Sequence, residues 1–141
     1  MMNRVVTCLL VVSLAGVISG CPLVPSETAI ELVNSGSSEV EVTLYIGSSQ
    51  YTTKDLLRLF GDEVEQTLRS GETITITRDC DDLQAVFIDN ARANLLGGLG
   101  PEDESNLLLD GRDFGCGDRI RFTFSYTLVP PRLDIVVSYP R

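Results

Sequence analysis

The 141-residue chain contains no histidine and no tryptophan, and its only lysine is Lys54. Without histidine, no Ser-His-Asp triad, Cys-His dyad or imidazole metal ligand can form. The residue three places before Lys54 is Tyr51, which excludes an S-x-x-K nucleophile. Aromatic residues make up only 6% of the chain, which disfavours stacking platforms for sugars, although Tyr45 and Tyr51 could contribute to one. These absences predict a protein that is not an enzyme and uses no cofactor.

Positive charge is also scarce. All 20 acidic residues follow Cys21, whereas one of the 11 basic residues, Arg4, precedes it. The chain from Cys21 onward therefore has a net charge of 10 − 20 = −10. Such a surface repels phosphate backbones and anionic lipid headgroups, so we expect no nucleic-acid partner and no membrane binding through basic residues.

The N-terminus has the pattern of an export signal. Arg4 supplies a positive charge, and residues 5–17 (VVTCLLVVSLAGV) form a 13-residue run without charge. This run is shorter than the roughly 20 residues of a membrane-spanning helix and has the length of a signal-peptide core. Small residues then follow at Ser19 and Gly20, immediately before Cys21. We therefore expect residues 1–20 to be removed, together with Cys8.

The tetrapeptide Ile18-Ser19-Gly20-Cys21 resembles the lipobox of bacterial lipoproteins. The resemblance implies that the Cys21 thiol carries a diacylglycerol, that cleavage precedes Cys21, and that fatty acids such as palmitate anchor the protein to a membrane of the cell envelope. Two or more acyl chains give stable anchoring. The absence of Asp after the cysteine, where this chain has Pro22, implies the outer membrane with the domain facing the periplasm. Residues 21–27 form the expected tether, and residues 28–141 the domain.

Two further cysteines, Cys80 and Cys116, remain in the exported chain. An oxidising compartment favours one disulfide between them, and two free thiols are the alternative. Two cysteines without histidine cannot fill a zinc site unless carboxylates complete it.

Alternation of apolar and polar residues dominates the rest of the sequence. Residues 39–46 place Val40, Val42, Leu44 and Ile46 on one face, and residues 119–126 do the same with Ile120, Phe122, Phe124 and Tyr126. This period of two predicts half-buried antiparallel strands. Turn-forming residues separate the predicted strands, which are 28–33, 39–46, 73–77, 83–88, 119–126 and 132–139.

These patterns predict an all-β fold, a small antiparallel, immunoglobulin-like sandwich. One short helix is expected near residues 53–60, with Thr52 at its start and Gly61 at its end. Residues 91–106 are predicted to be a long mobile loop. The segments ELVNSGSSEVEVTLYI and CGDRIRFTFSY also resemble small lipoproteins of planctomycete-type bacteria, which implies no particular activity.

Carboxylates are the most abundant ionisable side chains of this sequence. They gather at Asp79, Asp81 and Asp82, at residues 102–104, and at residues 110–113. Calcium takes six to eight oxygen ligands, so Asp79, Asp81 and Asp82 are weak calcium candidates, although no EF-hand pattern is present. Solvated loops are the simpler interpretation.

The leading hypothesis is a lipid-anchored, non-catalytic envelope protein, a structural or interaction module whose partner is an envelope protein or glycan. One alternative is a calcium-dependent or polar-ligand binding module that uses the loop carboxylates. A more remote alternative is a carboxylate-based hydrolase, because residue type alone does not exclude a pair of catalytic carboxylates.

Overall fold

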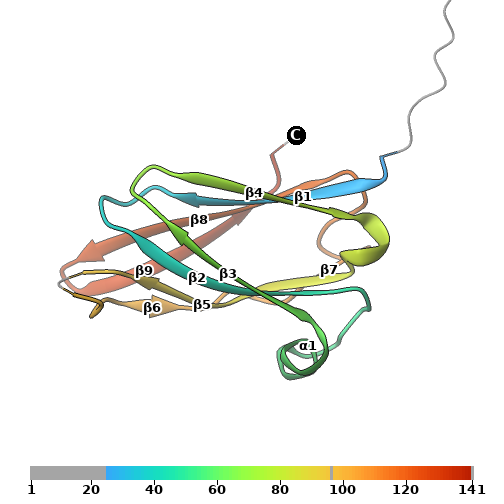
Figure 1. Cartoon of the computed structure of the whole chain (residues 1–141), viewed down its shortest axis with the longest axis horizontal. Helices are drawn as coiled ribbons and strands as arrows, with labels where there is room; N and C mark the ends of the chain where they lie inside the picture. Colours follow the sequence, from blue (N-terminus) through green and yellow to red (C-terminus); the bar gives the residue numbers. More distant parts are fainter. Residues whose placement is uncertain (1–24, 96, 141) are drawn as a thin grey trace, which may run out of the picture.

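The computed structural model describes residues 25–95 and 97–140, which form two packed β-sheets with one short α-helix (Figure 1). The elements in chain order are β1 (Glu27–Asn34), β2 (Val40–Gly47), α1 (Lys54–Phe60), β3 (Asp62–Leu68), β4 (Thr73–Asp79), the 3-10 helix η1 (Cys80–Asp82), β5 (Ala85–Ala93), β6 (Glu102–Asp103), β7 (Leu108–Leu109), β8 (Arg119–Leu128) and β9 (Pro131–Ser138). No helix in this described part is long and apolar enough to cross a membrane.

One sheet has the strand order β4-β1-β8-β9, and the other has the order β3-β2-β5-β6, with β7 also pairing with β5. The predicted all-β sandwich with one short helix is confirmed. Among the strands of residues 25–95 and 97–140, all pairs are antiparallel except β1 and β8, which run parallel with Ala29 opposite Arg119. These two strands lie in the middle of their sheet, and each brings an alternating apolar face into the core.

The alternating strands fill the space between the sheets as predicted. The apolar positions of β2 are buried, and Ile120, Phe122 and Phe124 of β8 are completely buried. Tyr126 packs only partly against this core. Burying one large apolar side chain contributes about 1.5–3 kcal/mol, so each of these buried positions stabilises the fold.

The strand predicted at residues 83–88 corresponds to β5, in which Ala85 through Ile88 are all buried. Both faces are covered because α1 packs on the outer side, where Leu57 meets Ala85 and Phe87. The helix begins one residue later than predicted, since the side chain of Thr53 accepts a hydrogen bond from the backbone N–H of Leu56.

Two predictions about local structure were wrong. Residues 91–106 are not one long loop, because β5 continues through Ala93 and β6 pairs with it at residues 102–103. Ala91 and Ala93 are fully buried and extend the alternation with small side chains. The strand β3 was missed, because its sequence DEVEQTL is polar and carries little apolar alternation. Its backbone pairs along the whole of β2, which makes it the edge of the sheet.

Candidate functional site

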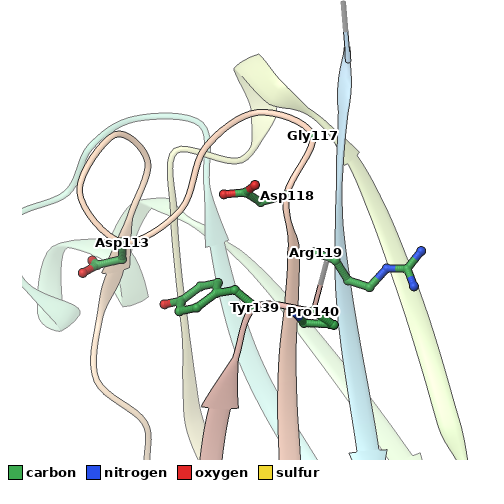
Figure 2. A pocket seen from close by; sticks show the side chains of 6 residues that line it. All are labelled: Asp113, Gly117, Asp118, Arg119, Tyr139 and Pro140. Atoms are coloured by element: carbon green, nitrogen blue, oxygen red, sulfur yellow. The ribbon is translucent and has the colours of Figure 1, made fainter.

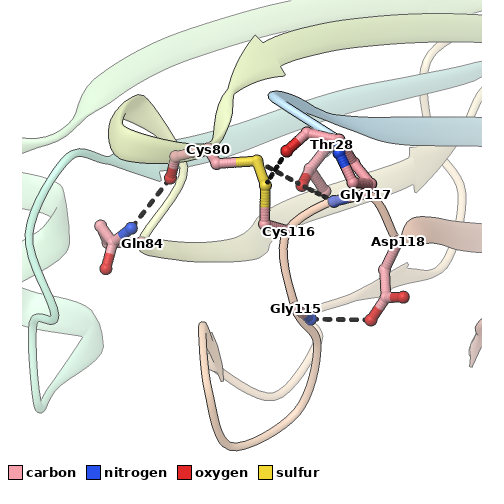
Figure 3. Close-up of a disulfide and its surroundings, with 8 residues drawn as sticks. Thr28, Cys80, Gln84, Gly115, Cys116, Gly117 and Asp118 are labelled. Carbon is pink, nitrogen blue, oxygen red and sulfur yellow. Dashed lines mark hydrogen bonds between the residues drawn. A yellow bond between two sulfur atoms is a disulfide. The ribbon is translucent and has the colours of Figure 1, made fainter. Parts of the chain in front are cut away.

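A disulfide joins Cys80 and Cys116, with their Cα atoms 5.3 Å apart, which confirms the predicted bridge (Figure 3). Cys80 follows β4, and Cys116 lies in the loop that precedes β8. Because β4 and β8 both pair with β1, the bridge crosses the sheet at the beginning of β1. Beneath it, the buried Thr28 accepts a hydrogen bond from the N–H of Gly117 through its Oγ1.

The chain enters the sandwich at this same end. The carbonyl oxygen of Pro25 lies 3.0 Å from the Sγ of Cys116, and the N–H of Cys80 donates to the carbonyl of Ser26. A Cβ at Gly117, whose φ is +89°, would lie 2.6 Å from the Cβ of Pro25. We call this end of the molecule, with Pro25 and the disulfide, the proximal end.

The calcium candidates Asp79, Asp81 and Asp82 also lie at the proximal end, around a hollow of about 660 Å³ beside the disulfide. Within residues 25–95 and 97–140, no group of three or more Cys, Asp or Glu side chains is close enough to hold a metal ion. The arrangement of these three aspartates therefore lends the calcium hypothesis no support.

A second hollow, of about 620 Å³, lies between the loop before β8 and the end of β9 (Figure 2). It is lined by two carboxylates, Asp113 and Asp118, together with Arg119 and Tyr139. The Asp118 carboxylate accepts a hydrogen bond from the N–H of Gly115 at 2.7 Å. Asp113 and Asp118 are therefore the pair of carboxylates that the hydrolase hypothesis would need at this hollow.

Asp113 is held in its charged form. The Nε of Arg112 donates to its carboxylate at 2.8 Å, and the backbone N–H of Leu109 donates at 2.8 Å. The hydrogen bond from Arg112 is the main reason that the pKa of Asp113 is lowered from its usual value. Burial raises the pKa of the neighbouring Tyr139. A glycosidase pair needs one carboxylic acid whose pKa is raised, so Asp113 does not fit the role of the general acid.

The structure separates the remaining acidic clusters. Glu102 and Asp103 form β6 and Glu104 follows it, whereas residues 110–113 form a tight turn after β7. Glu104 forms ion pairs with Lys54 at 2.8 Å and with Arg58 at 3.5 Å. Glu104 therefore neutralises basic residues of α1 at the surface.

Sequence reasoning missed the polar network around α1. The Nε of Arg58 donates to Asp89 at 2.6 Å, and its guanidinium also pairs with Asp55 at 2.7 Å. The hydrogen bond with Asp89 is the main reason that the pKa of Arg58 is raised. The Nζ of Lys54 and the Cζ of Arg58 lie 5.5 and 5.2 Å from the centre of the Phe87 ring. The spacing of Asp55 and Arg58 was the only sequence signal for this network, which holds α1 against β5.

The lipobox residues Ile18, Ser19, Gly20 and Cys21 lie outside the residues that the structure describes, as do the predicted signal peptide 1–20 and the first part of the tether 21–27.

No protein-family model matches the chain, and no curated protein matches it. Similar solved structures include the T6SS lipoprotein TssJ1 from Pseudomonas aeruginosa, with 16% identity, a TM-score of 0.48, and coverage of 83% of this chain and 98% of that one. Wild-type pneumolysin (13% identity) and an intermedilysin mutant in complex with human CD59 (9%) each give a TM-score of 0.43. Each of these two matches covers 81% of this chain, and this chain spans about a quarter of the length of either protein. These likenesses are too distant to indicate function, and none supports the resemblance to planctomycete-type lipoproteins.

Proposed function

We propose that this protein is a lipid-anchored, non-catalytic interaction module of a bacterial cell envelope. The observation that carries the proposal is the tetrapeptide Ile18-Ser19-Gly20-Cys21, placed four residues before Pro25. Four residue steps span at most about 14 Å, so a lipid on Cys21 would hold the proximal end close to the membrane.

The charge of the domain supports the need for such an anchor. The chain from Cys21 onward carries a net charge of −10, which opposes adsorption to anionic membranes. Covalent acyl chains attach a protein to a bilayer regardless of that charge. Pro22 in place of an aspartate after the cysteine favours the outer membrane, with the domain in the periplasm.

A non-catalytic role is supported by the use of the polar side chains. Asp113 is paired with Arg112, Asp118 bonds the backbone of its own loop, and Glu104 neutralises α1. Each of these carboxylates stabilises local structure, so the leading role is to hold a partner, an envelope protein or glycan, at the membrane.

Replacing Cys21 tests the anchor directly. We expect Cys21→Ser to move the protein from the membrane fraction to the soluble fraction and to abolish labelling by an alkyne-bearing fatty acid. Cys8→Ser is the matched control, because Cys8 lies in the segment expected to be removed, and this variant should stay lipidated and membrane-bound. Unchanged membrane retention of Cys21→Ser would refute the anchor.

A further inference from the structure

At the end of the sandwich opposite the beginning of β1, the β5–β6 loop and the turn between β8 and β9 lie near each other (Figure 1). Both segments carry exposed apolar side chains. Val129 and Leu99 are the most exposed large apolar side chains among the described residues, at 92% and 82%, and Leu128 is 62% exposed. Between the β5–β6 loop and the β8–β9 turn lies a groove of about 720 Å³, which we call the distal groove. Its apolar walls are formed by Leu95, Leu99, Pro101, Leu128 and Pro131.

Internal hydrogen bonds hold the first wall of the distal groove in place. The N–H of Leu99 donates to the carbonyl of Leu95 at 3.1 Å, and the N–H of Ala93 donates to the carbonyl of Pro101 at 3.1 Å. At Gly100 the chain passes so close to β5 that a Cβ would lie 1.6 Å from the carbonyl oxygen of Ala93. Only glycine permits this approach, so the backbone at Gly100 packs directly against the end of β5.

The second wall is also ordered by its own contacts. The hydroxyl of Thr127 donates to the carbonyl of Pro130 at 3.0 Å, and Leu128 pairs with Pro131 across the turn. One side of the groove ends at the ion pair between Arg92 and Glu102. A groove that is formed before binding loses less conformational entropy when it is filled, which favours affinity.

The chain's own N-terminus cannot occupy the distal groove if Cys21 is its lipidated first residue. Ala29 is paired with Arg119 at the beginning of β8, and Leu128 lies nine residues further along that strand. This distance is about 30 Å at the rise of a β-strand, and the four steps from Cys21 to Pro25 span at most about 14 Å. This step rests on the proposed function, which also places the groove at the end away from the anchoring membrane.

A second copy of the chain is a poor occupant as well. Two domains of net charge −10 repel each other, and a few exposed side chains provide far less than the roughly 1,200–2,000 Å² of a stable interface. A contiguous apolar groove at a protein surface marks a binding site, and a large apolar side chain seated in a pocket carries much of the energy of such contacts.

We propose that the distal groove binds an extended segment of another protein through one large aliphatic or aromatic side chain. The flanking residues of that segment are neutral or basic, because acidic flanks would be repelled by the charge of this domain. Cys21 and the distal groove then have separate roles. The lipid on Cys21 attaches the protein to the membrane, and the distal groove binds the partner.

A peptide-display selection against the full-length protein in phosphatidylethanolamine nanodiscs tests the chemistry of the partner. We expect the recovered peptides to share one large apolar residue without acidic neighbours. A recovered peptide, labelled with a fluorophore, should bind Leu99→Asp and Leu128→Asp at least tenfold more weakly than the parent protein. Leu59→Asp is the matched control, since Leu59 is an exposed leucine on α1 and its replacement should leave binding unchanged.

Several results would overturn the groove proposal. They are peptides without an apolar residue, equal binding to Leu99→Asp and the parent, or equal loss in Leu59→Asp. Binding of the Cys21→Ser protein to protein-free phosphatidylethanolamine vesicles through Leu99 and Leu128 would assign the surface to lipid, and concentration-dependent dimers abolished by Leu128→Asp would assign it to a second copy. A parent protein that fractionates with the membrane but binds no selected peptide would refute the groove alone, whereas membrane-bound Cys21→Ser would refute the anchor alone.

Discussion

The two ends of the sandwich use their side chains in opposite ways. At the proximal end, Thr28 is buried beneath a disulfide, and polar groups such as Asp118 bond to the backbone around them. At the distal end, Leu99 and Val129 project into solvent from loops that are themselves well held. The proximal end is cross-linked by the disulfide and by polar contacts within the chain, whereas the distal end leaves apolar surface uncovered. The proposed binding site therefore lies at the opposite end of the sandwich from the disulfide.

Removing the disulfide should produce the largest change. Replacing both Cys80 and Cys116 with alanine frees a loop whose ends are 36 residues apart, and we expect the free energy of unfolding to fall by about 3–4 kcal/mol. Urea unfolding followed by circular dichroism measures the effect. Wild-type protein that has been reduced and alkylated should show the same loss. A loss below about 1 kcal/mol would mean that the proximal end does not hold the fold together.

Neutralising Asp113 should have a smaller effect that depends on pH. The pKa of Asp113 in the folded protein lies below its usual value of 3.8, so its charged form stabilises the fold above that value. This stabilisation is lost as the pH falls through the lowered pKa. Near neutral pH, Asp113→Asn should therefore have a lower free energy of unfolding than wild type, with a smaller loss than in the disulfide variant. In acid, the free energies of unfolding of Asp113→Asn and wild type should converge. Thermal melts across an acid pH series test this, and a difference that does not change with pH would contradict it.

Replacing Leu99 with serine should have the smallest effect on stability. The side chain is 82% exposed, and substitutions at such positions change stability by about 0.5 kcal/mol or less in either direction. Urea unfolding of Leu99→Ser should therefore coincide with that of wild type. Leu44→Ser is the matched comparison, since Leu44 is completely buried and its replacement should destabilise the fold strongly. A large loss in Leu99→Ser would show that the distal end also serves stability.

Much of the fold could be predicted because several strands alternate apolar and polar residues, and this alternation indicates which face is buried. In β8 every second residue is apolar, and Ile120, Phe122 and Phe124 are buried as that alternation predicts. In β3 the alternation is hidden by glutamates, and Val64 is only partly buried. An edge strand is formed by backbone hydrogen bonds to its neighbour, and those bonds leave little trace in the side chains.

The candidate sites could be predicted only in part. The pairing of Cys80 with Cys116 was favoured by their number and by the export that the lipobox resemblance implies, and the structure joins them by a disulfide. The distal groove could not be found in this way. Leu95 follows β5 and Leu128 ends β8, so the two residues are far apart in sequence, and neither segment carries a recognisable motif.

The sequence by itself determined the β class of the protein, the disulfide partners, and the proposed address at Cys21, because each depends on residue type and local spacing. The tertiary structure alone decided that β1 and β8 run parallel, that β3 forms an edge, and that Leu99 and Leu128 line one groove. These features depend on which distant segments the folded core brings together, and local spacing carries no information about such pairings.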